Sequence, residues 1–228
     1  GAGLLRDIPL MIEMTEAVVN ATGLPVTVKT RLGWDDNNIK IVEIARELQE
    51  TGIQALAIHG RTRAQMYKGK ANWEAIAEVK NHPEIDIPII GNGDINGPED
   101  ARIAFDNYGI DGVMIGRATV GKPWLFKSIR DYLETGIIPD EPDVKEKTEV
   151  AKKHLAKSIE WKGYPRGIYE MRKHLSNYFK GLPHFKDIKR QLVTTLDSRE
   201  IYDMLDFIAE KYADFDSSKL KSDAFFQY

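Results

Sequence analysis

The hydrophobic and polar positions in the first part of the chain alternate between short apolar runs and longer amphipathic segments. The apolar runs at 24–30, 53–58, 87–91 and 111–115 are typical of buried strands. Apolar residues three and four positions apart predict helices at 8–21, 38–51, 72–81, 98–107 and 123–135. Strands that alternate with helices in this way indicate an α/β fold built on a parallel sheet.

Each expected strand ends in a polar, glycine-bearing tip, which favours a (β/α)8 TIM barrel with its site at the C-terminal ends of the strands. A doubly wound sheet would also fit the alternation. Four strands cannot close a barrel, because eight are needed. We therefore expect four βα units, the second half of a barrel, in a chain that begins at Gly1 and is a fragment or a processed product.

The second part of the chain is predicted to be entirely helical. Prolines and acidic residues at 137–143 indicate a linker. The helices that we expect beyond it are 144–162, 166–180, 185–196 and 199–212. We therefore predict three parts, which are half of a catalytic barrel at 1–136, the linker at 137–143 and an all-α helical bundle domain at 144–228.

The composition narrows the class of protein. The chain has 228 residues and no cysteine, which excludes disulfides, thiolate metal sites and a cysteine nucleophile within it, and we expect no metal site. No apolar run reaches the roughly 18 residues that a membrane helix needs. We expect a cytoplasmic protein without a membrane partner, and the sequence leaves its oligomeric state open.

Charge is unevenly distributed along the chain. The net charge is −3, yet residues 145–190 carry 13 basic and 5 acidic side chains, a net charge of +8. A basic block inside an acidic chain suggests a polyanionic partner, although a solvated lysine-rich helix face would give the same pattern. The aromatic residues interleaved with this block are Trp161, Tyr164, Tyr169, Tyr178 and Phe179. Such interleaving suits RNA, but each of these residues is by itself more typical of a bundle core.

Two glycine loops, GNGD and IGRA, follow the last two expected strands and suggest a phosphate site. Gly91, Gly93 and Gly116 would let backbone N–H groups approach an anion, and Arg117 would add a forked donor. In a barrel, the loops after the last two strands are the usual phosphate site. The alternative is that these glycines only form tight turns.

Further polar residues lie at the ends of the first two expected strands. Lys29 and Arg31 share one face of their strand, because strand side chains alternate. Lys29 lies in an apolar run, so we expect its ammonium to face a ligand anion rather than to be buried unpaired. His59 ends the second strand and Tyr67 follows in a loop at the rim. Beside Lys29 and the glycine loops we expect His59 to face a ligand, with a structural histidine as the alternative, and simple loop packing is the alternative for Tyr67.

These motifs together resemble the tRNA-dihydrouridine synthases, especially the bacterial B-type branch. The matching segments are PVTVKTRLGW (25–34), HGRTRAQMYKGKANW (59–73), IPIIGNGDI (87–95), DGVMIGRATVGKPWLF (111–126) and MRKHLSNYFKGLP (171–183). The resemblance implies a barrel that binds FMN tightly, is reduced by NADPH, and reduces the C5=C6 bond of a uridine in tRNA.

The resemblance also implies roles for particular residues. Those that would bind the flavin are Lys29, His59, Asn92, Gly93, Asp94, Gly116 and Arg117. Arg31 and Tyr67 would contact the substrate uracil. The side chains that would bind the tRNA backbone are Lys152, Lys153, Arg166, Arg172 and Lys173.

This chain departs from the family in one respect, because the family's proton donor is a cysteine on an earlier strand and the chain has none. We therefore expect no catalytic residue within it. A non-catalytic tRNA-binding remnant and a different phosphate-binding barrel enzyme remain as alternatives.

Overall fold

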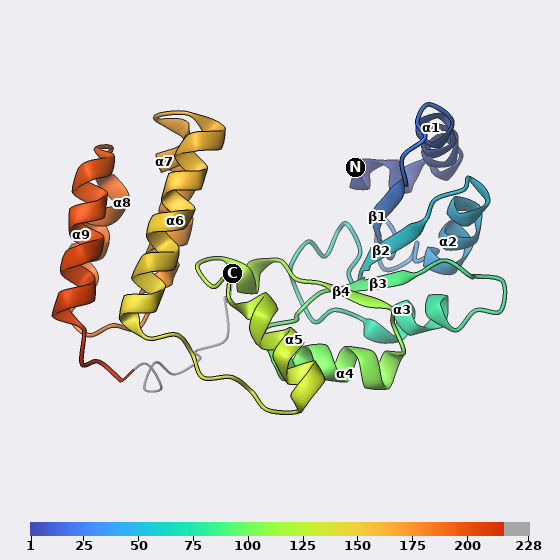
Figure 1. Cartoon of the computed structure of the whole chain (residues 1–228). Helices are drawn as coiled ribbons and strands as arrows, with labels where there is room; N and C mark the ends of the chain where they lie inside the picture. The colour runs from blue at the N-terminus through green and yellow to red at the C-terminus, as the bar shows by residue number, and fades with distance from the viewer. Residues whose placement is uncertain (217–228) are drawn as a thin grey trace. The chain divides into compact units, whose positions relative to one another are not determined.

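The computed structural model describes residues 1–216 of the chain (Figure 1). It contains a parallel sheet with helices, an α/β fold, and it divides into two compact units. The first unit runs from Gly1 to Gly116, and the second begins at Arg117. Each unit is described by itself below.

Four parallel strands form the sheet of the first unit. They are β1 (Thr27–Arg31), β2 (Ala55–His59), β3 (Ile89–Asn92) and β4 (Gly112–Met114). Their order across the sheet is the same as their order in the chain, β1-β2-β3-β4. All three neighbouring pairs are parallel, so the four C-terminal ends lie along one edge of the sheet.

The helices of this unit follow one another beside the sheet (Figure 1). They are the 3₁₀ helix η1 (Ala2–Arg6) and the α-helices α1 (Ile8–Asn20), α2 (Ile41–Glu50), α3 (Trp73–Lys80) and α4 (Pro98–Tyr108). Local signals set their ends. Asp7 accepts the N–H of Leu10 at the start of α1, and Gly109 ends α4 with a φ of 62°.

The two faces of the sheet differ in burial. Leu56, Ile58 and Ile89 are fully buried on one face, together with Leu48 of α2 and Ile76 of α3. The other face carries the alternate strand residues, which include the polar residues of the strand ends. The apolar face forms the core, and the second face carries Lys29, Arg31, His59 and Asn92.

The second unit is helical throughout the part that the structure describes. It contains the 3₁₀ helix η2 (Arg117–Thr119) and the α-helices α5 (Leu125–Thr135), α6 (Val144–Lys162), α7 (Arg166–Tyr178), α8 (Lys186–Thr194) and α9 (Ser198–Lys211). A capping box of Asp143 and Glu146 starts α6. Leu155, Leu175 and Leu205 contribute to a core in which all three are almost completely buried.

The predicted helices and strands are all present, and their ends differ from the prediction by at most about three residues. The two 3₁₀ helices were not predicted. The second compact unit begins at Arg117 and therefore includes α5, which the sequence grouped with the barrel part at 1–136. Residues 217–228 of the predicted helical domain 144–228 lie outside the described residues.

Two features are absent from residues 1–216. No helix there combines the length and the apolar character that crossing a membrane requires. No group of three or more His, Cys, Asp or Glu side chains there could hold a metal ion.

Helices α6 and α7 approach closely at Gly167, and this contact predicts the effect of a substitution. A Cβ at this position would lie 2.6 Å from the carbonyl oxygen of Ser158 and 2.7 Å from Cα of Ile159. Overpacking costs about 1–3 kcal/mol, which exceeds the roughly 1 kcal/mol that alanine gains over glycine in a helix. We expect Gly167→Ala to lower the melting temperature measured by far-UV circular dichroism.

The control is Gly23→Ala in the first unit, where a Cβ would meet no atom of the described residues within 4 Å. Equal melting temperatures for the two variants would contradict the close approach of α6 and α7.

Candidate functional site

Polar side chains from three neighbouring strands form one row at the C-terminal edge of the sheet. Arg31 is paired in register with His59, His59 with Asn92, and Asn92 with Met114. Residues in register on parallel strands point to the same face. Lys29 lies two residues before Arg31, so it shares that face and sits one step deeper along β1.

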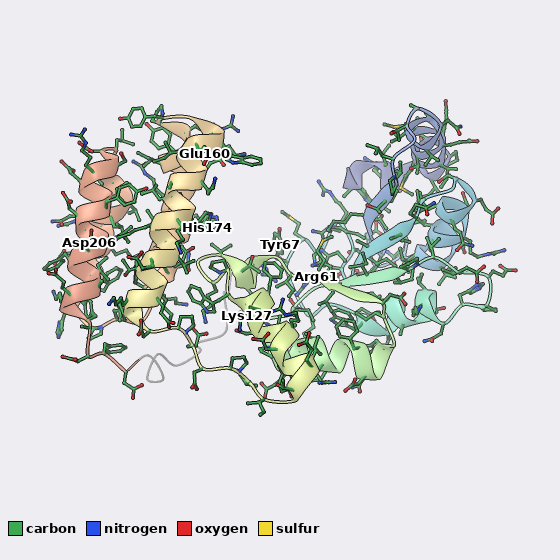
Figure 2. All side chains as sticks on the ribbon, viewed as in Figure 1. Arg61, Tyr67, Lys127, Glu160, His174 and Asp206 are labelled. Atoms are coloured by element: carbon green, nitrogen blue, oxygen red, sulfur yellow. The ribbon has the colours of Figure 1, made fainter. Side chains whose placement is uncertain are left out.

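The guanidinium of Arg61 lies at the centre of the loops that follow these strands. Its side chain is only 2% exposed. It donates to the carbonyl oxygens of Lys68 and Gly69, and it forms an ion pair with Asp94 at 2.8 Å. Arg61 therefore ties the loop after β2 to the loop after β3. Figure 2 labels Arg61 close to Tyr67, which belongs to the same loop.

Sequence reasoning missed this role of Arg61, because an arginine in a polar loop is usually exposed to solvent. Its place in the sequence could have indicated this role. Arg61 follows the end of a buried strand by two residues, and the GNGD loop with its aspartate follows the next strand. A charge that is enclosed so deeply requires a partner, and Asp94 is the carboxylate that the neighbouring loop offers.

The GNGD loop adopts an unusual backbone conformation that brings its polar groups into place. Gly93 has a φ of 134° and Asp94 a φ of 55°. A Cβ at Gly93 would lie 2.6 Å from Cβ of Ala71, so only glycine fits. The Asp94 carboxylate also accepts the N–H of Ala71 at 2.8 Å, while the Asn92 amide donates to the Met114 carbonyl oxygen at 2.7 Å.

Arg31 holds the outer part of the loop after β2. Its Nη1 donates to the carbonyl oxygens of Thr62 at 2.9 Å and Met66 at 3.0 Å. Tyr67, next in the chain, is 53% exposed, and its ring centroid lies 6.4 Å from that of His59. The structure thus brings Arg31, His59 and Tyr67 to the same end of the sheet.

Three cationic side chains, those of Lys29, Arg31 and Arg61, surround the imidazole of His59 in the candidate site. Burial is the largest cause that lowers the pKa of His59 from 6.5 to about 4, and the charges of Arg31, Lys29 and Arg61 lower it further against the opposing effect of Asp94. Desolvation, with a smaller contribution from Arg31, also lowers the pKa of Lys29. His59 is therefore uncharged at neutral pH, and the surrounding cations favour an anionic ligand.

The predicted cofactor set is divided between the two units. The first unit brings together Lys29, His59, Asn92, Gly93 and Asp94 at one end of the sheet.

The remaining two predicted residues flank the boundary between the units. Gly116 is the last residue of the first unit, and Arg117 begins η2 in the second unit. Their role at a phosphate therefore stays a prediction.

The basic side chains predicted to bind tRNA differ in how they are held. Lys152 lies against α9, where it pairs with Asp206 as well as with Glu149 at 3.1 Å. The hydrogen bond to Asp206 is the largest cause that raises the pKa of Lys152, and Glu149 adds to it. Lys153 and Lys173 are exposed on α6 and α7.

The two predicted arginines also take part in contacts within the helical unit. Arg166 pairs with Glu170 at 2.9 Å. Arg172 donates to the Thr194 carbonyl oxygen at 3.1 Å, and its guanidinium lies 4.8 Å from the ring centroid of Tyr169.

The aromatic residues of the basic block fall into two groups. Tyr178 and Phe179 belong to the bundle core, as expected. The same expectation is wrong for Trp161, Tyr164 and Tyr169, which are 79%, 66% and 47% exposed. These three lie in or beside the turn between α6 and α7, where the described part of the unit places no further element over them.

Comparison with known proteins identifies relatives. A family model described as "Dihydrouridine synthase (Dus)" matches residues 1–213. The chain is 44% identical over 206 residues to "Probable tRNA-dihydrouridine synthase 1" of Synechocystis sp., covering 90% of this chain and 57% of that protein. It is 41% identical over 191 residues to "tRNA-dihydrouridine synthase B" of Pseudomonas aeruginosa, covering 84% and 57%. The chain thus spans somewhat more than half the length of these relatives.

Among solved structures, a mandelate oxidase with (S)-4-hydroxymandelic acid is 15% identical, with a TM-score of 0.31. The alignment covers 88% of this chain and 68% of the oxidase. A TM-score this low carries no conclusion about fold or function.

The lowered pKa of His59 predicts how stability depends on pH. Between pH 6.5 and about 4 the unfolded chain binds a proton at this position and the folded chain does not. The free energy of unfolding therefore falls as the pH is lowered through this window. We expect His59→Gln to remove the pH-dependent part of the free energy of unfolding that His59 contributes. The variant should therefore lose less stability than the wild type between pH 7 and pH 5, as measured by urea unfolding followed by tryptophan fluorescence.

His82→Gln, which changes a histidine outside the site, is the matched control. An identical loss of stability in the wild type and in both variants would show that His59 does not stay neutral in the folded protein.

Proposed function

The chain belongs to the dihydrouridine synthase family, and we propose that it is part of an enzyme that reduces the C5=C6 bond of a uridine in tRNA. One observation carries the proposal. The row of Arg31, His59 and Asn92, with Lys29 on the same face, gathers ligand-binding side chains at the strand ends of a chain that matches the family over residues 1–213.

The donor set of this face fits a flavin mononucleotide. A phosphate-bearing, planar cofactor needs cations, backbone N–H groups in a glycine loop and an uncharged polar group against its ring. Lys29, the GNGD loop with Gly93, and the neutral His59 are groups of these kinds. When bound, FMN that has been reduced by NADPH would supply the hydride for the uracil ring.

We assign the individual roles from these positions. The ammonium of Lys29 would place a positive charge beside the flavin ring and stabilise its anionic reduced form. His59 would hydrogen-bond the ring in its uncharged state. Asn92, Gly93, Asp94, Gly116 and Arg117 would hold the region of the ribityl chain and its phosphate. Asp94 has this role alongside its ion pair with Arg61.

Arg31 and Tyr67 would orient the uracil at the outer end of the site. Arg31 anchors the loop that carries Tyr67, so one side chain would both shape the entrance and contact the substrate. The target base must leave the stacked tRNA to reach a ring held at the strand ends. The family's proton donor is a cysteine, and this chain contains none, so the proton-donor step is assigned to no residue here.

We propose that the four βα units are half of an eight-stranded barrel. The unbroken order β1-β2-β3-β4 supports this, because a doubly wound sheet reverses its strand order at a switch point. The binding face of the sheet would then line the interior of the closed barrel.

The second unit would bind the tRNA backbone through its basic side chains. Lys153 and Lys173 are exposed, and Lys152, Arg166 and Arg172 would exchange surface contacts for phosphates. For Arg166 this exchange costs little, because its ion pair with Glu170 is exposed and exposed ion pairs contribute little to stability. A tRNA-binding remnant without redox function is the second candidate, and the exposed basic side chains of this unit support it.

Flavin binding separates these two candidates. We expect the purified chain to bind FMN, with a visible flavin spectrum that dithionite bleaches reversibly. Lys29→Met should raise the dissociation constant for FMN about tenfold, the value of one charge-assisted hydrogen bond, while Lys40→Met should leave it unchanged. Fluorescence titration of FMN measures both. A wild-type chain that binds tRNA but no FMN would support the remnant instead.

Binding of tRNA tests the basic surface. We expect Lys153→Glu combined with Lys173→Glu to weaken tRNA binding and to make the slope of log affinity against log salt shallower by about 0.7–0.9 for each phosphate that is no longer neutralised. FMN binding should not change. Arg199→Glu, an exposed charge on α9 outside the basic block, is the control. Equal salt slopes for the wild type and the double variant would rule out these two lysines as phosphate ligands.

A further inference from the structure

A groove of about 490 Å³ lies between α6 and α7 in the second unit. His154, Lys157 and Trp161 line it from α6, where their spacing of three and four residues places them on one helix face. Met171 and His174 line it from α7. None of these residues belongs to the predicted backbone-binding set. Figure 2 labels His174 on this helix pair.

Trp161 forms an exposed aromatic wall of the groove. Its indole is 79% exposed, whereas the chain's three other tryptophans are only partly exposed. An exposed indole offers a large aromatic face on which another planar group can stack. Tyr164 and Tyr169, in or near the turn between α6 and α7, are also exposed.

Two of the side chains that line the groove are imidazoles, those of His154 and His174. Their rings meet edge to face with centroids 4.6 Å apart, and His154 Nδ1 lies 3.1 Å from the hydroxyl of the buried Tyr178. The buried Nδ1 of His174 has no hydrogen-bond partner among residues 1–216. Burial is the largest cause that lowers the pKa of both histidines, so both imidazoles are uncharged at neutral pH. A neutral planar group fits beside these rings better than a phosphate does.

Two lysines, Lys157 and Lys162, are the cationic residues that line the groove. Lys157 pairs with Glu160 at 2.8 Å and Lys162 pairs with Glu170 at 3.7 Å, and both lysine side chains remain exposed. Glu170 also lines the groove. Exposed pairs of this kind break at little cost, which leaves both ammonium groups available to phosphates on either side of a planar ligand.

We propose that this groove binds one unpaired nucleobase of the tRNA, stacked on Trp161 with its edge toward His154 and His174. Lys157 and Lys162 contact the flanking phosphates. The combination of an exposed indole, two uncharged imidazoles and two exposed lysines matches a nucleotide. This inference rests on the proposed function, and it adds a base-binding site to a surface otherwise assigned to the backbone.

The test measures binding of an unmodified tRNA transcript to the chain by filter retention at two salt concentrations. Stacking of one base predicts that Trp161→Ala weakens binding about tenfold with an unchanged salt slope, because the lysines that bind phosphate stay in place. Trp161→Phe should retain most of the affinity. Phe207→Ala is the matched control, since Phe207 is an exposed aromatic on α9 with Lys211 beside it.

A second measurement distinguishes a base from the backbone. A short single-stranded RNA should quench the tryptophan fluorescence of the wild type more than that of Trp161→Phe, while a duplex of the same sequence should quench both alike. Equal tRNA affinities for the wild type and Trp161→Ala, or equal quenching of the wild type by single strand and duplex, would overturn the nucleobase site. A wild-type chain that fails to bind tRNA at all would overturn the proposed function itself.

Discussion

The ion pair between Arg61 and Asp94 is the interaction on which the candidate site depends. Arg61 is almost completely enclosed, and its donors reach carbonyl oxygens of its own loop as well as the carboxylate of the GNGD loop. Removing Asp94 would take the carboxylate partner from an almost completely buried guanidinium, and an uncompensated buried charge is among the costlier defects in a folded protein. The loops that follow β2 and β3 are therefore held as one assembly beside His59.

This assembly explains the electrostatic character of the binding face. Asp94 is engaged by Arg61, while Lys29 and Arg31 place two further cations on the same sheet face as His59. The same cations, together with burial, keep His59 neutral. A cationic face around an uncharged imidazole can hold an anionic, planar cofactor and still offer a neutral hydrogen-bonding group to its ring.

The helical unit uses different chemistry. Its interior is apolar and aromatic, with Tyr178 and Phe179 in the core, and its surface carries the basic side chains. The groove between α6 and α7 is lined by Trp161, whose exposed indole belongs neither to the core nor to the charged surface. The first unit thus gathers its polar groups at the strand ends, and the helical unit carries exposed lysines and an exposed indole on its surface.

The sequence by itself determined the helices and strands, because apolar periodicity and caps such as Asp143 act over a few residues. It also placed Lys29 and Arg31 on one strand face, since alternation is a local property. Only the tertiary structure decided that Arg61 is buried in an ion pair with Asp94. It also decided that Lys152 forms an ion pair with Asp206 and that Trp161 is exposed. Those outcomes depend on which distant segments meet, and no pattern within one segment carries that information.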